Sequence, residues 1–167
     1  EGKTSLTESI LYATKAIDRL GKVTDGNTVS DYDPEEIKRT ISISTSIANV
    51  EYGKNKINIL DAPGFFDFVG EVIEAMRVAE SGMIVLSAKG GVSVGAQKAW
   101  LNMKAAGLPV MLYVSKLDEE HADFYKTVAD AKALFGVSVC PVIIPIMDGD
   151  KAVGIVNIVS RKAYKTD

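Results

Sequence analysis

Glu1-Gly2-Lys3-Thr4-Ser5 is the stretch that decides the fold of this chain. It matches the last part of the glycine-rich motif G-x-x-x-x-G-K-[ST], whose backbone N–H groups surround the phosphates of a nucleotide. In this interpretation Lys3 reaches the outer phosphates and the Thr4 hydroxyl ligates Mg²⁺. A helix that starts here would point its positive end at the same anion. Gly-Lys-Thr often occurs by chance, so a nucleotide site needs support from elsewhere in the chain.

Asp61-Ala62-Pro63-Gly64 gives the first support, because it directly follows the apolar run 57–60. That position is the carboxyl end of a predicted buried strand, where open α/β sheets bind their ligands. We expect Asp61 to hold Mg²⁺ through a water molecule and the Gly64 N–H to bond a γ-phosphate.

Ser115-Lys116-Leu117-Asp118 gives the second support and follows the apolar run 110–114. Asp118 can accept hydrogen bonds from N1–H and the 2-amino group of guanine, which adenine lacks, and Lys116 would lie along the base. A solvated turn at the end of a strand is the alternative for both residues. Three such loops in this order indicate a guanine-nucleotide switch protein. Asp118 disfavours the remaining interpretation, an ATP-using protein.

These segments resemble a known family, the GTP-binding domain of translation elongation factor G, and more closely the elongation factor G-like proteins. The resemblance covers Gly2 to about Tyr164. It implies an α/β P-loop GTPase fold with a mostly parallel sheet flanked by helices. It also implies GTP or GDP and Mg²⁺ as cofactors and the ribosome as partner of the full-length protein. The single cysteine fits a reducing cytoplasm, so we expect a cytoplasmic location. The segments that carry it are Gly2-Lys3-Thr4-Ser5-Leu6-Thr7-Glu8, Arg39-Thr40-Ile41-Ser42-Ile43, Asn58-Ile59-Leu60-Asp61-Ala62-Pro63-Gly64, Ala75-Met76-Arg77-Val78-Ala79 and Ser115-Lys116-Leu117-Asp118.

Phe65 is the most consequential departure from the family pattern. The family has a histidine directly after Asp-x-Pro-Gly that positions the attacking water. A phenyl ring can neither accept a proton nor hydrogen-bond water, so we assign no catalytic residue. His121, the single histidine, stands among acidic residues beyond the third loop, where we expect an exposed residue at the start of a helix.

Two serines depart from the pattern more mildly. Ser42 stands where the family has a threonine that completes Mg²⁺ coordination, and it retains the hydroxyl. A solvent-facing position on a strand is the alternative for Ser42. Ser115 replaces an asparagine that braces the phosphate loop, which we expect to lower nucleotide affinity. The resemblance therefore implies nucleotide binding by Gly2, Lys3, Thr4, Ser5, Asp61, Gly64, Ser115, Lys116 and Asp118, and metal binding by Thr4, Ser42 and Asp61.

Two functional hypotheses stay open. The first is a translational GTPase that hydrolyses GTP to GDP and phosphate on the ribosome. The second is a GTP-dependent binding switch whose hydrolysis is weak or absent because of Phe65. Both predict Mg²⁺-dependent guanine nucleotide binding by the full-length protein.

Composition narrows the class of protein. The chain has 167 residues, with 47% hydrophobic and 25% charged residues, which suits one globular domain. A net charge of −3 argues against a broad nucleic-acid surface and against direct DNA binding. The single cysteine, Cys140, cannot form an internal disulfide, and we expect it to lie in the core. Apolar runs are too short for a membrane span.

Hydrophobic spacing predicts alternating helices and strands, with the domain at 1–147 and the start of an inserted subdomain at 148–167. We expect the domain to be truncated at its N-terminus, with its first strand missing, so that the chain alone binds nucleotide poorly and is inactive. The first half should contain a helix at 3–17, a mobile loop at 21–32, a helix start at Asp33-Pro34 and a strand at 41–47. Asp148-Gly149 predicts a later hairpin.

Overall fold

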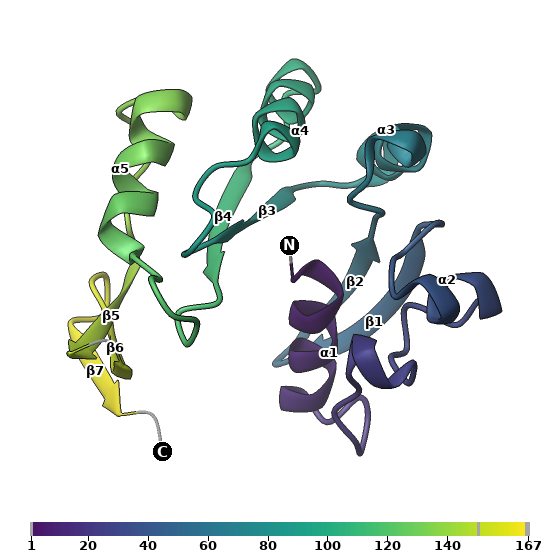
Figure 1. The fold of residues 1–167 in the computed structure, drawn as a ribbon, viewed down its shortest axis with the longest axis horizontal. Helices are drawn as coiled ribbons and strands as arrows, with labels where there is room; N and C mark the ends of the chain where they lie inside the picture. Colours follow the sequence, from purple (N-terminus) through teal and green to yellow (C-terminus); the bar gives the residue numbers. More distant parts are fainter. Residues whose placement is uncertain (1, 150, 166–167) are drawn as a thin grey trace. The chain divides into compact units, whose positions relative to one another are not determined.

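The computed structural model describes residues 2–149 and 151–165. It divides into two compact units, which we describe separately. The N-terminal unit comprises residues 2–82 and 102–109, and the C-terminal unit comprises residues 83–101 and 110–165. Helices and strands alternate along the chain (Figure 1). In order they are α1 (Lys3–Ala13), η1 (Val23–Asp25), α2 (Pro34–Arg39), β1 (Ser46–Tyr52), β2 (Asn55–Asp61), η2 (Phe66–Phe68), α3 (Val69–Val78), β3 (Gly82–Ser87), α4 (Val94–Ala105), β4 (Val110–Ser115), α5 (Phe124–Phe135), β5 (Ile143–Asp148), β6 (Lys151–Asn157) and β7 (Lys162–Lys165).

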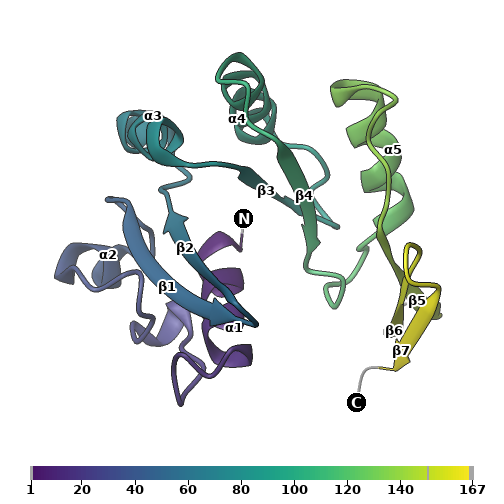
Figure 2. The same ribbon diagram turned by 180° about the vertical axis from the view of Figure 1, so that it is seen from behind.

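The N-terminal unit is built on an antiparallel hairpin covered by α1. Strands β1 and β2 pair from Ser46↔Asp61 to Tyr52↔Asn55, and Gly53 supplies the left-handed φ of 64° that the turn needs. Helix α1 packs on this hairpin (Figures 1 and 2). The core that α1 shares with the hairpin consists of Leu11, Ala48 and Val50, with Ile10, Ile17 and Ile59 around them. This packing places the start of α1 beside the end of β2.

Strands β3 and β4 form a parallel pair. The Gly82 N–H donates to the Pro109 carbonyl and the Ala88 N–H donates to the Ser115 carbonyl, both at 2.9 Å. Because these bonds join the two starts and the two ends, the strands run in the same direction. Four consecutive residues of β3, 84–87, are buried, as expected for a strand covered on both faces.

The rest of the C-terminal unit contains most of α4, all of α5 and a second sheet. Trp100 of α4 stacks on Phe135 of α5 with ring centroids 4.7 Å apart. Strands β5, β6 and β7 form an antiparallel sheet, which confirms the hairpin expected at Asp148-Gly149. The division expected after residue 147 falls near the end of β5. None of the described helices is both long and apolar enough to cross a membrane.

Three local expectations were wrong. Helix α1 ends at Ala13 rather than near residue 17, because Lys15 adopts a left-handed φ of 58° and the Ala16 N–H donates back to the Leu11 carbonyl. Strand β1 begins at Ser46, so residues 41–45 are irregular. Cys140 is exposed rather than in the core, because it lies in the connection between α5 and β5.

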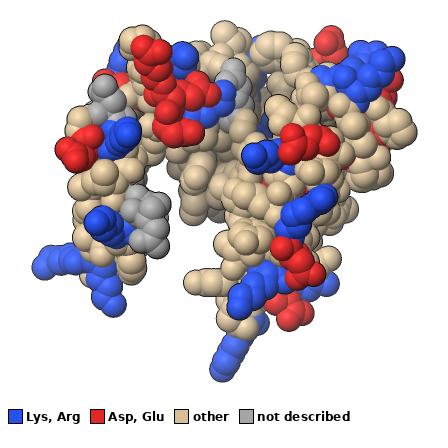
Figure 3. Space-filling model, turned by 60° about the horizontal axis from the view of Figure 1, so that its bottom comes forward, with Lys and Arg blue, Asp and Glu red and all other residues tan. Residues whose placement is uncertain are grey.

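Charged side chains of both signs are mixed on the surface. Figure 3 shows Lys and Arg interspersed with Asp and Glu over the face in view, in keeping with the net charge of −3.

Candidate functional site

The start of α1 brings two predicted phosphate ligands together. Gly2 is the N-cap of α1 and has a φ of 88°, a left-handed conformation that glycine adopts without strain. Lys3, the first residue of the helix, reaches the loop after β2, since a Cβ built on Gly64 would lie only 2.8 Å from its Nζ atom. Ser5, in the same first turn, is exposed. An ammonium beside bare backbone N–H groups is suited to an oxyanion such as a phosphate.

Thr4 and Ser42, the two hydroxyls predicted to bind metal, touch each other. Their oxygens are 3.2 Å apart, and the Ser42 Oγ also donates to Asp31 Oδ1 at 2.7 Å. Ser42 precedes β1, so the alternative of a solvent-facing strand residue was wrong about its position.

Asp61 lies at the end of β2 with only 4% of its surface exposed. Its pKa is raised above the ordinary value, because burial of the carboxyl outweighs the nearby Thr4 hydroxyl and Lys3 ammonium, which both lower it. Among the described residues, three buried side-chain oxygens lack a hydrogen-bond partner: Ser30 Oγ, Asp31 Oδ2 and Asp61 Oδ2. Such atoms are costly to bury unless something binds them.

This set of atoms fits Mg²⁺. The ion prefers hard oxygen ligands, one or two of them carboxylates, and completes its coordination with water and phosphate oxygens. Asp31 and Asp61 supply two carboxylates with unused oxygens, and Thr4 and Ser42 supply hydroxyls beside them. Within residues 2–149 and 151–165 no cage of three or more acidic, histidine or cysteine side chains exists. The donor set therefore leaves coordination positions for a nucleotide and water.

Asp31 was not foreseen from the sequence, because it falls in the loop at 21–32, which has no periodicity. It is nevertheless buried, with 4% of its surface exposed. The loop is fastened to α1 by Glu8, a fully buried carboxylate that accepts the N–H groups of Gly21 and Val29. Neither residue shows a signal in the sequence, since each acts through contacts with distant backbone or side chains.

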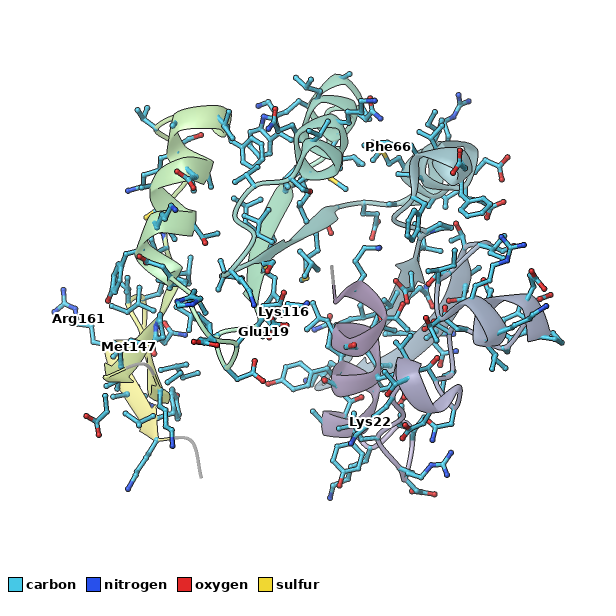
Figure 4. The ribbon with its side chains drawn as sticks, in the orientation of Figure 1. Lys22, Phe66, Lys116, Glu119, Met147 and Arg161 are labelled. Carbon is cyan, nitrogen blue, oxygen red and sulfur yellow. The ribbon has the colours of Figure 1, made fainter. Side chains whose placement is uncertain are left out.

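Phe65, at the position of the family's histidine, is 54% exposed and precedes η2. Its neighbour Phe66, labelled in Figure 4 near the start of α3, is 53% exposed. His121 is exposed, as expected, and lies 3.5 Å from Glu120, but it stands in the turn before α5 rather than at the start of the helix.

The predicted base-binding loop lies in the C-terminal unit, at the end of β4. The Ser115 hydroxyl donates to the Leu86 carbonyl at 2.9 Å and so joins β4 to β3. Lys116 has a φ of 60°, and its Nζ lies 2.9 Å from Glu119 Oε1 (Figure 4). Glu119, which the sequence did not single out, also lies 3.9 Å from Lys89. Asp118 is exposed and accessible to a ligand.

Comparison with known proteins shows which family the chain resembles. A family model described as the elongation factor Tu GTP binding domain matches residues 1–166. The chain is 34% identical to an elongation factor G-like protein of Mycobacterium tuberculosis over 164 residues, which are 98% of this chain and 22% of that protein. It is 36% identical to the mitochondrial ribosome-releasing factor 2 of Debaryomyces hansenii over 169 residues, 98% of this chain and 20% of that protein.

A solved structure shares the fold. The crystal structure of a Thermus thermophilus protein matches with a TM-score of 0.94 and 37% identity, covering 99% of this chain and 25% of that one. The chain thus spans about a fifth to a quarter of the length of the proteins it resembles.

Proposed function

This chain belongs to the family of elongation factor Tu GTP-binding domains, and from that premise we propose that it binds GTP and GDP with Mg²⁺ as part of an elongation factor G-like translation factor. The observation that carries the proposal is the cluster at the start of α1. There two hydroxyls, two buried carboxylates with unused oxygens, and a lysine beside Gly64 occupy one small region.

Each residue of the cluster has a role in the proposal. Lys3 and the backbone around Gly64 bind the outer phosphates, and Thr4 and Ser42 hold the metal through their hydroxyls. Asp61 orients metal-bound water, and Asp31 holds the Ser42 hydroxyl at 2.7 Å. When bound, Mg²⁺ supplies the positive charge that neutralises the phosphates.

The specificity for guanine rests on the β4 loop. The exposed Asp118 carboxylate accepts from N1–H and the 2-amino group, and the Lys116 stem lies along the base while Glu119 holds its ammonium. This role requires the β4 loop and the phosphate loop to meet around one nucleotide, which is part of the proposal.

A binding titration tests these assignments. The complete natural protein that contains this sequence is titrated with fluorescently labelled GTP at several Mg²⁺ concentrations, with ATP as competitor. Thr4→Ala should weaken Mg²⁺-dependent binding about tenfold or more, since loss of a group at a metal site costs roughly that much. Ser9→Ala removes an exposed hydroxyl from the same helix and should have no effect. Equal competition by ATP would contradict the guanine assignment.

For hydrolysis we propose that the full-length protein is a GTPase that acts on the ribosome. A second candidate is a GTP-dependent switch with weak or absent hydrolysis, which the Phe65 side chain favours because it cannot polarise water. Phosphate release by full-length protein with and without ribosomes distinguishes the two. No release in either sample would exclude the GTPase. Phe65→His should raise turnover under the second candidate, and an unchanged rate would contradict it.

A further inference from the structure

We propose that Glu36 and Glu71 together position the Ser42 hydroxyl for the divalent cation by binding the three amide groups that follow it. The proposal rests on the Mg²⁺-dependent nucleotide binding proposed above. We call residues 43–45 with these two carboxylates the carboxylate clamp.

Glu36 holds both sides of Ser42. It belongs to α2 and is buried, with 3% of its surface exposed. Its Oε1 atom accepts the Ile43 N–H at 2.8 Å and the Ser44 N–H at 3.1 Å, while its backbone carbonyl accepts the Ile41 N–H at 3.2 Å. One residue therefore binds the backbone immediately before and immediately after Ser42.

Glu71 holds the next residue from a different helix. Its Oε2 accepts the Thr45 N–H at 2.6 Å, and its backbone carbonyl accepts the Thr45 hydroxyl at 3.3 Å. Glu71 lies in the first turn of α3, shortly after the loop that contains Gly64 and Phe65. The amides of residues 43–45 are thus bound by carboxylates from α2, which precedes the β1–β2 hairpin in the sequence, and from α3, which follows it.

The carboxylate clamp supplies the backbone hydrogen bonds that a strand would otherwise supply to residues 43–45. Residues 41–45 precede β1, so no strand ladder fixes their backbone. Hydrogen bonds to an ionised carboxylate are about twice as strong as neutral ones. Ser42 must stay within hydrogen-bond distance of both Thr4 and Asp31, and a free backbone would lose that geometry. Since Glu71 is on α3, a movement of that helix changes the position of Thr45 and, through it, of Ser42.

The test compares Glu36→Ala, Glu36→Gln and Glu71→Ala in the complete natural protein, with Glu74→Ala as the matched control. Glu74 is exposed on the same helix as Glu71. The first readout is hydrogen exchange of the amides of residues 43–45 without nucleotide. Glu36→Ala should speed exchange at Ile43 and Ser44, and Glu71→Ala should do so at Thr45, by about tenfold or more in each case. Glu74→Ala should change none of them.

The second readout is the Mg²⁺ concentration at half-maximal binding of labelled GTP. Glu36→Ala and Glu71→Ala should raise it about tenfold, as expected when a group that orients a metal ligand is lost. GTP affinity without Mg²⁺ should not change. Glu36→Gln retains one acceptor oxygen and should fall between the wild type and Glu36→Ala. Should Glu36→Ala fail to fold by circular dichroism, Glu36→Gln and Glu71→Ala carry the comparison.

The outcomes separate the two proposals. Unchanged exchange in the variants would overturn the clamp. Faster exchange with an unchanged Mg²⁺ requirement would show a structural tether and overturn the positioning role. A wild-type protein that binds no GTP at any Mg²⁺ concentration would refute the proposed function, and with it the role toward the cation, while exchange would still decide the clamp.

Discussion

Replacing Glu8 with alanine should release the loop at 21–32 from α1. Glu8 is fully buried, with 0% of its surface exposed, and its two oxygens accept the N–H groups of Gly21 and Val29. The contact with Gly21 is so close that a Cβ there would lie 2.7 Å from Glu8 Oε2 and 2.6 Å from the Asn27 carbonyl. The Glu8→Ala variant removes both acceptors and leaves two amide groups without partners.

The magnitude follows from those two bonds. A buried amide left without an acceptor costs about 1–3 kcal/mol, so the variant should lose about 2–6 kcal/mol. That is a large share of the roughly 5–15 kcal/mol that stabilises a typical domain. For each amide, about 1–3 kcal/mol corresponds to exchange that is roughly 5- to 150-fold faster. Glu8→Gln keeps one acceptor oxygen and should lose about half as much.

Hydrogen exchange of the complete protein provides the measurement, because it resolves single amides where a whole-protein melting curve cannot. Ser9→Ala, which removes an exposed hydroxyl one residue further along α1, is the control and should exchange as the wild type does. Wild-type rates at Gly21 and Val29 in Glu8→Ala would refute the claim that this carboxylate holds the loop. Gly21→Ala tests the same contact from the other side and should destabilise the loop similarly.

Three further predictions concern the proposed ligand site. Because the pKa of Asp61 is raised in the folded state, protonation favours folding, so Mg²⁺-free protein should lose stability as pH rises from the ordinary value of 3.8 through the raised one. Asp61→Asn should flatten this pH dependence of stability in denaturant titrations. An unaltered pH profile would contradict the claim that Asp61 causes it. Gly64→Ala should weaken GTP binding about tenfold while folding stays nearly normal, because the new Cβ meets only the mobile end of Lys3 at 2.8 Å; unchanged titrations would contradict the phosphate role. Asp118→Asn should reduce GTP affinity and raise that for xanthosine triphosphate, because an amide can donate to the 2-oxo group of xanthine. Unchanged competition between the two nucleotides would exclude Asp118 from base recognition.

The family and the α/β P-loop GTPase fold predicted from the sequence are confirmed. The hairpin of β1 and β2 was also predictable, since alternating apolar residues and Gly53 report burial on one face and a tight turn. Lys3 and Asp61 could be placed near each other because Lys3 begins a helix within the phosphate-binding motif and Asp61 ends a predicted strand, and open α/β sheets bind ligands at such positions. Whether the loops with Asp61 and Asp118 share one nucleotide stays a prediction.

The irregular backbone could not be predicted. Ile41 and Ile43 alternate with polar residues as in a strand, yet β1 begins only at Ser46. The competing interaction is the binding of the amides of residues 43–45 by Glu36 and Glu71, and Glu71 lies 26 residues away from Thr45. Hydrophobic periodicity reports which face of an element is buried. It contains no information about a distant carboxylate that takes the place of a strand partner.

The buried acids of the N-terminal unit fall into two pairs with different contacts. Glu8, Asp31, Glu36 and Asp61 are each at most 4% exposed. Glu8 and Glu36 use their oxygens to bind backbone N–H groups and so hold the loops around the site. Asp31 and Asp61 each retain an oxygen without a partner among the described residues, and these are the two beside Thr4 and Ser42.

In our proposal Glu8 and Glu36 hold the loops, whereas Asp31 and Asp61 lie beside the hydroxyls that would bind the cation. Burial disfavours the charged form of a carboxyl group, which is why the pKa of Asp61 is raised even though the Thr4 hydroxyl and the Lys3 ammonium lie nearby. A divalent cation would remove that cost at both aspartates at once. Its binding should therefore stabilise the loop that contains Asp31 and Ser42, because a ligand that binds only the folded state adds its binding energy to folding.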